Sequence, residues 1–352
     1  MYTRFYYFKN FSIDFFFINS EAKKSPLSTG ERGFRGVGPM SKIYKYLIYS
    51  VLSIILFTSC EDVIEVDLPA NEEKLVVDGQ LSNRAGVQTL KLMISQPYFN
   101  NSTPPPATGA TAKVTDNEGN IYEFKQRLDS LNKPTIFFEW APKGNEKFGK
   151  TGNTYLLEVN FRGETYLSST KMNRIPAIDS LIYVFKDNTG QPSGNADEPK
   201  KGFRPEFYAR DLQGIGDCYY IKGYRFDKAT NKWRLQREEA AYDAAFQPGA
   251  RADGLVFILP LRRAIGNQLF NEGDSSRVEL FSVSEDHFYF LRAAENEEQN
   301  QGLFATPPAT FLTNIVNKNP NSTKKALGWF SVAGFSTYST IIDAKKASKD
   351  ND

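Results

Sequence analysis

The chain contains few of the residues that usually carry out nucleophilic catalysis or bind zinc. Its 352 residues include two cysteines, Cys60 and Cys218, and a single histidine, His287. A Ser/His/Asp triad would have to use His287, and a zinc site needs histidine and cysteine ligands that lie close together. We therefore predict no catalytic residue, no metal site and no cofactor. We interpret Cys218 as a small buried side chain.

The chain has an apolar run, Tyr46–Phe57, that is too short to span a bilayer. Two lysines precede this run, and two small residues and a cysteine follow it: Lys42, Lys45, Thr58, Ser59 and Cys60. This order is typical of a bacterial lipoprotein export signal. We predict that residues 40–59 are a signal peptide and that Cys60 is lipidated, although Phe57 stands where such signals usually carry leucine. A buried helix or strand is the alternative.

Residues 1–39 would precede such a signal and hide it from the export machinery. They join an aromatic, low-complexity stretch to a stretch rich in glycine, serine and arginine, without the periodicity of a strand or a helix. We expect that translation starts at Met40 and that residues 1–39 are a mis-annotated extension. A genuine N-terminal extension is the alternative.

The net positive charge of the full chain comes from the segment that cleavage would remove. Cleavage before Cys60 would leave 35 basic and 38 acidic residues, so the mature chain would have a net charge of −3. Its basic residues are scattered among acids and form no stripe, which argues against a nucleic-acid partner. Since Cys60 would carry lipid, Cys218 would have no partner and no disulfide is predicted.

The residues after Cys60 alternate acidic and aliphatic side chains. Glu61 and Asp62 resemble the surface-export signal of Bacteroidota lipoproteins, which would place the protein on the cell exterior. The alternative is a half-buried edge strand with outward polar positions. We assign residues 60–73 to an anchor segment.

The rest of the chain is predicted to be mainly β. In residues 74–172, segments with the alternating pattern of β-strands are separated by turns, one of them at Arg162 and Gly163. This arrangement predicts an immunoglobulin-like or transthyretin-like sandwich. Residues 173–342 are predicted to form a second, antiparallel β-rich domain with one helix between Phe281 and Asn300, capped by Ser284. Its strands are expected at 203–209, 219–226, 255–259 and 277–284. Residues 343–352 would be a charged tail.

One loop combines two large aromatic residues with a proline run. Its candidate partner-binding residues are Tyr98, Phe99, Pro104, Pro105 and Pro106. Prolines hold the chain near polyproline II, which lowers the entropy lost on docking. The equally supported alternative is a connection between sheets with Phe99 in the core. The cluster Asp116–Asn120 offers oxygen ligands for calcium, but its spacing favours a plain hairpin turn.

Several motifs resemble domain-of-unknown-function family 4249 of Bacteroidota lipoproteins. They are Cys60–Asp62, Val66–Pro69, Leu75–Gly79, Gln96–Ser102, Pro104–Pro106, Val114–Asp116, Phe304–Pro308, Asn314–Ile315 and Ala326–Phe330. The likeness covers nearly all of residues 60–342. It implies a surface accessory role, since members are often encoded beside a TonB-dependent outer-membrane receptor, and it supplies no catalytic residues.

These observations together predict a non-enzymatic, lipid-anchored protein of the outer membrane that faces the cell exterior. It would act as an accessory or ligand-capture partner of a TonB-dependent receptor, with a small molecule, glycan or peptide as an unidentified ligand. The alternative is a surface hydrolase or adhesin.

Overall fold

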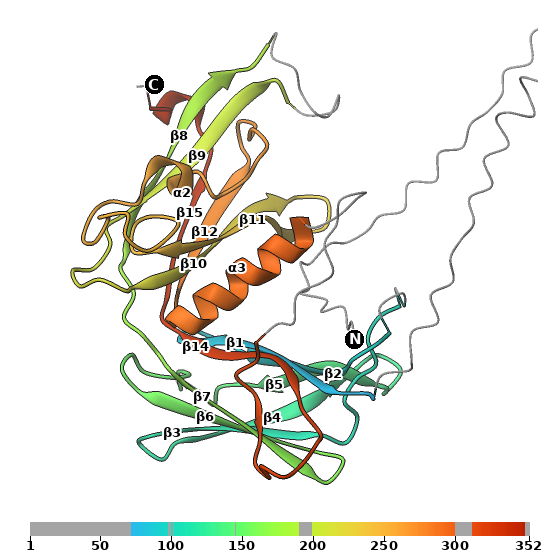
Figure 1. Cartoon of the computed structure of the whole chain (residues 1–352). Helices are drawn as coiled ribbons and strands as arrows, with labels where there is room; N and C mark the ends of the chain where they lie inside the picture. The colour runs from blue at the N-terminus through green and yellow to red at the C-terminus, as the bar shows by residue number, and fades with distance from the viewer. Residues whose placement is uncertain are drawn as a thin grey trace, which may run out of the picture. The chain divides into compact units, whose positions relative to one another are not determined.

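The computed structural model describes residues 72–97, 100, 102–144, 146–189, 199–299 and 312–348 (Figure 1). Residues 70–352 belong to one compact unit. The described chain is mainly β, which confirms the predicted fold class. Cys60, Glu61, Asp62, Tyr98 and Phe99 lie outside the described residues. Among those that are described, no helix is both long and apolar enough to cross a membrane.

The described residues form a first sheet of nine strands in the order β13-β7-β6-β3-β4-β5-β2-β1-β14. Its strands are β1 (Leu75–Ser82), β2 (Gln88–Ile94), β3 (Thr111–Asp116), β4 (Ile121–Leu128), β5 (Pro134–Trp140), β6 (Thr154–Phe161), β7 (Glu164–Lys171), β13 (Val316–Asn317) and β14 (Leu327–Ala333). Alternate side chains of these strands point to one shared core. At its centre the buried Phe148 ring contacts the rings of Tyr122, Trp140 and Tyr155.

Strand β14 reaches this sheet from the far end of the chain and pairs in parallel with β1. The edge of β14 that does not pair with β1 is covered by side chains from the segment before β13. Asn314 Oδ1 accepts the Phe330 N–H (2.9 Å) and Asn314 Nδ2 donates to the Phe330 carbonyl (2.7 Å). Thr313 Oγ1 donates to the carbonyl of Gly328 (2.7 Å). These bonds occupy backbone groups that an exposed edge strand would offer to another chain.

The remaining strands form a hairpin and a four-stranded sheet. The hairpin pairs β8 (Ile178–Asp187) with β9 (Lys201–Ala209), and the sheet has the order β11-β10-β12-β15. Its strands are β10 (Cys218–Asp227), β11 (Lys232–Tyr242), β12 (Ser275–Val283) and β15 (Phe335–Ile341). A second core packs the hairpin and the short helix α2 (Leu259–Arg262) against this sheet. Figure 1 shows α3 (Glu285–Gln299) beside β10 and β11.

Helix α3 confirms the predicted helix and its cap. Ser284 Oγ accepts the backbone N–H of His287 (3.2 Å), and Glu285 and Asp286 occupy the first turn, where the helix dipole favours acids. Phe288 and Leu291 pack into a third apolar cluster on the four-stranded sheet. The helix therefore forms because one of its sides is apolar and its first turn is capped.

Several segments differ from the sequence-based expectation. Residues 255–259 form no strand, because Leu255 donates to the carbonyl of Ala252 in a turn and Pro260 lies at the start of α2. Residues 344–346 of the expected charged tail form a short 3-10 helix, and the N–H of Ser348 donates to the carbonyl of Tyr183. The expected domain boundary after residue 172 does not coincide with a boundary between sheets. Strands β13 and β14 come after this residue in the chain and yet join the first sheet.

Candidate functional site

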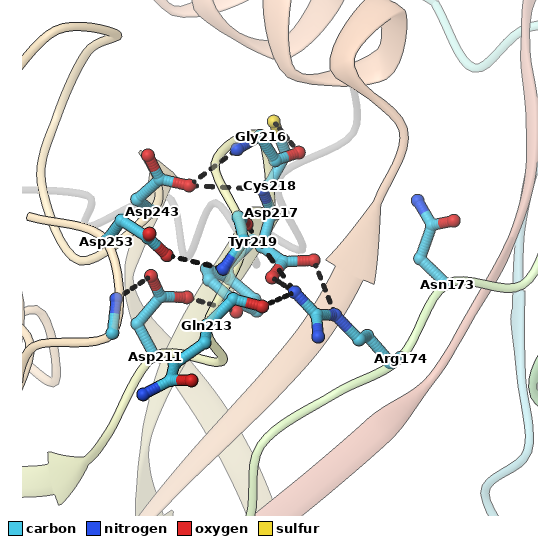
Figure 2. Close-up of polar contacts among 12 residues, drawn as sticks. Asn173, Arg174, Asp211, Gln213, Gly216, Asp217, Cys218, Tyr219, Asp243 and Asp253 are labelled. Atoms are coloured by element: carbon cyan, nitrogen blue, oxygen red, sulfur yellow. Dashed lines mark hydrogen bonds and ion pairs between the residues drawn. The ribbon is translucent and has the colours of Figure 1, made fainter.

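Four aspartates gather where the loop between β9 and β10 meets the segment between β11 and α2 (Figure 2). Together with Arg174 we call them the aspartate network. Its members are Asp211, Asp217, Asp243, Asp253 and Arg174. Gly214 and Gly216 allow the chain to turn here, since both have positive φ angles. The network is thus built on the short loops that end these strands.

The carboxylates of the network accept hydrogen bonds from loop amides. Asp243 Oδ1 accepts the N–H groups of Gly216 (2.8 Å) and Asp217 (3.1 Å). Asp253 Oδ1 accepts the N–H of Gly214 (2.8 Å). Such side-chain bonds to the backbone fix a loop in one conformation.

Asp211 and Arg174 complete the network. Asp211 accepts hydrogen bonds from the Tyr219 hydroxyl (2.5 Å) and from the N–H of Gly254 (3.1 Å). Arg174 donates to both carboxylate oxygens of Asp217 (3.2 and 2.5 Å) and to the carbonyl of Gln213 (2.6 Å). A guanidinium used in this bidentate way positions its partner firmly.

Burial sets the protonation of the groups inside this region. It raises the pKa of Asp211 above its usual value, and it raises the pKa of the neighbouring Tyr219 hydroxyl, which also donates to Asp211. Burial, followed by the negative charges of Glu285 and Asp243, raises the pKa of the Cys218 thiol to about 12. Since the thiolate is the nucleophilic form, Cys218 is a poor nucleophile.

We expect Cys218 to react with a soluble thiol reagent at least about 100-fold more slowly in the folded protein than in the unfolded chain, because burial disfavours the thiolate and blocks access. The measurement is the labelling rate of a Cys60→Ala variant, in which Cys218 is the sole thiol, with and without denaturant. Rapid labelling of a protein that keeps its folded spectrum would show that Cys218 is reactive.

His287 is also poorly suited to proton transfer. Its side chain is 2% exposed and stacks on Trp329, with ring centroids 5.5 Å apart. Burial, followed by the positive charge of Lys222, lowers the pKa of His287 to about 3. His287 Nδ1 forms no hydrogen bond in the structure. The imidazole is therefore a neutral packing group between α3 and β14.

The proline run of the predicted partner-binding loop lies against β2. Pro104 is buried, whereas Pro105 is exposed and Pro106 is partly buried. The carbonyl of Pro105 accepts the N–H of Ile94 (2.9 Å), and Pro106 forms a bridge with Met93. These bonds favour the connection between strands as the role of the prolines. The role of Tyr98 and Phe99 stays a prediction.

The calcium candidate folds as a hairpin turn. Asp116 Oδ1 accepts the N–H groups of Glu118 (3.0 Å) and Asn120 (2.9 Å), and Asp116 Oδ2 accepts from Asn120 Nδ2 (2.9 Å). These bonds lower the pKa of Asp116, although burial acts in the opposite direction. Within the described ranges, no group of three or more His, Cys, Asp or Glu side chains is arranged to hold a metal ion.

Sequence reasoning missed three exposed aliphatic residues on the loops that the aspartate network fixes. We call Ile215, Leu255 and Ile258 the loop-tip aliphatics, and their exposed fractions are 82%, 52% and 37%. The two loops lie side by side, because the N–H of Asp211 donates to the carbonyl of Leu255 (2.8 Å) and Gly214 donates to Asp253. An isoleucine between two turn glycines was the signal in the sequence.

The chain matches no curated protein. Residues 61–339 match the sequence profile of a domain of unknown function, DUF4249. This range includes the aspartate network, the loop-tip aliphatics and every strand except the last residues of β15. The chain therefore belongs to the DUF4249 family.

Proposed function

We propose that the protein is a lipid-anchored, non-enzymatic accessory protein that contacts a TonB-dependent receptor at the bacterial outer membrane. The observation that carries this proposal is the rigid presentation of the loop-tip aliphatics by the aspartate network. Exposed aliphatic side chains cost free energy in water, and a group of them on neighbouring loops is typical of a surface that another protein covers.

The hydrogen bonds of the network make this surface suitable for binding. A loop that is already fixed loses little conformational entropy when it docks, so more of the contact energy appears as affinity. Asp243 and Asp253 hold both sides of Ile215 through the amides of Gly214 and Gly216. Ile215 can therefore act as a central apolar anchor, of the kind that dominates protein interfaces.

The chemistry of the titratable groups supports a binding role over a hydrolytic one. Cys218 is held as a thiol and His287 as a neutral imidazole, each by burial. The carboxylates of Asp211 and Asp217 already accept hydrogen bonds within the network. These groups stabilise loops and packing, which is what an accessory protein requires.

The proposed tether explains how a modest contact surface would suffice. A lipid on Cys60 would confine the protein to one leaflet, with Glu61 and Asp62 directing it to the cell exterior. A neighbouring receptor in the same plane is then present at high effective concentration. The test is capture of the tagged protein from solubilised membranes of a bacterial host that carries the matching receptor, followed by identification of the retained proteins. Retention of a TonB-dependent receptor supports the proposal, and its absence contradicts it.

We expect a radioactive or clickable fatty acid to label the wild-type protein in such a host, because Cys60 would receive a diacylglycerol and an amide-linked chain, which together give stable anchoring. The Cys60→Ala variant should carry no label. Cys218→Ala is the matched control and should be labelled like the wild type, since Cys218 is buried in the fold. An unlabelled wild-type protein would end the lipoprotein interpretation.

A further inference from the structure

A cleft of about 280 Å³ lies where the described chain begins. It is bounded by the first residues of β1, by the turn between β6 and β7, and by the loop that precedes β14. Its floor includes the buried rings of Phe161 and Tyr166. The volume is near the lower end of the range for ligand pockets, roughly 300 Å³, so the cleft suits a group of a few atoms.

One wall of the cleft is the turn between β6 and β7, which holds an arginine in a defined position. Arg162 has a φ of +47°, which places it in the left-handed region of a tight turn. Its guanidinium lies 5.0 Å from the centre of the Phe161 ring, and its Nη1 is 2.8 Å from Glu73 Oε2. The Phe161 ring and the Glu73 carboxylate thus both hold the guanidinium of Arg162.

Another wall of the cleft carries two adjacent lysines on a fixed backbone. Asn317 Nδ2 donates to the carbonyl of Lys324 (2.9 Å) and to Glu164 Oε2 (2.9 Å), so it connects the two walls. Ser322 Oγ accepts the N–H of Lys324 (3.2 Å). The backbone that carries Lys324 and Lys325 is therefore fixed. Both side chains are exposed and line the cleft.

The charges of the cleft favour an anion. Its lining has four basic and three acidic side chains, and one acid, Glu73, is already paired with Arg162. Among the described residues, Lys74, Lys324 and Lys325 take part in no ion pair. The three ammonium groups outnumber the two remaining carboxylates of the lining, Glu72 and Glu164, so the cleft keeps a net positive charge. This charge attracts anions, most strongly at low ionic strength.

We propose that this cleft binds a phosphate group, supplied by an anionic lipid headgroup or by a soluble phosphate. The lipid source rests on the proposed tether, because the thirteen residues from Cys60 to Glu72 can span at most roughly 45 Å when extended. A tethered protein would thus keep the cleft within reach of the membrane surface. Binding there would orient the protein on the leaflet.

The test uses residues 60–352 expressed without lipid, since residues 70–352 form one compact unit, and each variant is first shown to melt cooperatively. Binding is measured by sedimentation with vesicles of phosphatidylcholine alone or mixed with phosphatidylglycerol. We expect binding to the mixed vesicles in low salt. Lys324→Ala with Lys325→Ala should reduce it at least fivefold, whereas Lys345→Ala with Lys346→Ala should leave it unchanged. The second pair is a matched control because these lysines are also adjacent and exposed.

A second arm separates the two sources of phosphate. Calorimetric titration with inorganic phosphate is performed on the same three proteins. Phosphate binding that needs Lys324 and Lys325, with no binding to vesicles, assigns the site to a soluble phosphate. Binding to neither probe, or equal losses in the two lysine-pair variants, overturns the proposal. Neither arm involves a lipidated Cys60 or a receptor, so failure here is distinct from failure of the proposed function.

Discussion

Replacing Gly328 by alanine is expected to unfold the protein under conditions in which Gly119→Ala stays folded. Both glycines have nearly the same φ angle, +93° for Gly328 and +90° for Gly119. An alanine Cβ at Gly119 would meet nothing within 4 Å, whereas at Gly328 it would lie 2.0 Å from the carbonyl oxygen of Val77. Gly328 is paired with Val77 in the parallel register of β14 and β1, so the overlap would separate these strands.

The difference in stability between the two variants separates the effect of this steric overlap from the effect of backbone strain. The left-handed conformation alone costs alanine about 1–2 kcal/mol, which is what we expect for Gly119→Ala. Gly328→Ala should lose at least about 4 kcal/mol, a large part of the net stability of a typical protein. Chemical denaturation of both purified variants measures these losses. Equal stabilities would contradict the close approach of β14 to β1.

We expect the wild-type protein to lose stability as the pH falls from 6.5 towards 3, by about 1.4 kcal/mol per pH unit from His287 alone. Burial and the nearby Lys222 lower the pKa of His287 from 6.5 to about 3, while Asp78 acts in the opposite direction. In this interval the unfolded chain binds a proton at His287 that the folded chain does not bind. Acidification therefore favours unfolding, by roughly 5 kcal/mol over the whole interval.

His287→Leu should flatten this dependence, since His287 is the single histidine of the chain. The measurement is the free energy of unfolding of both proteins at several pH values between 7 and 4, and the slopes are compared. An independent reading comes from the imidazole NMR signal of the wild type, which should stay at its neutral position down to pH 4. An imidazole that titrates near its ordinary pKa in the folded protein would show that His287 is accessible to solvent.

The first sheet could be predicted well because its strands are local and alternate clearly. The hairpin at Arg162 and Gly163 joins β6 and β7 as expected, since the turn residues and the alternation of flanking side chains lie close together in the sequence. Strand β11 was missed because its sequence is charged. Glu239, on that strand, is buried and forms ion pairs with Arg237 and Arg292, which no periodicity can show.

Contacts between distant parts of the chain could not be read from the sequence. The parallel pairing of β14 with β1 joins residues about 250 positions apart, and local patterns do not specify such partners. The structure also explains three residues of the motifs that resemble the DUF4249 family. Asn314 covers the edge of β14, Gly328 permits its approach to β1, and Trp329 stacks on His287. These residues stabilise the fold and do not by themselves form a ligand site.

Among candidate sites, the aspartate network could not be predicted, because its members come from three separate loops. Asp211, Asp217, Asp243 and Asp253 stand in turn-like sequence, and each one alone is typical of a loop. Their meeting depends on the order of strands β9, β10 and β11. That the loop-tip aliphatics stand on neighbouring loops is likewise apparent only in the folded chain.

The most direct test of the account is capture of the tagged protein, after crosslinking on intact cells, with three forms compared. The loop-tip variant carries Ile215→Ser and Leu255→Ser, and the control carries Leu128→Ser and Leu131→Ser, two exposed leucines of the β4–β5 hairpin. We expect the wild type and the control to retain a TonB-dependent receptor and the loop-tip variant to retain about tenfold less, because two interface anchors are lost. A wild type that retains no receptor, or a loop-tip variant that retains as much as the control, would contradict the proposed role of this surface.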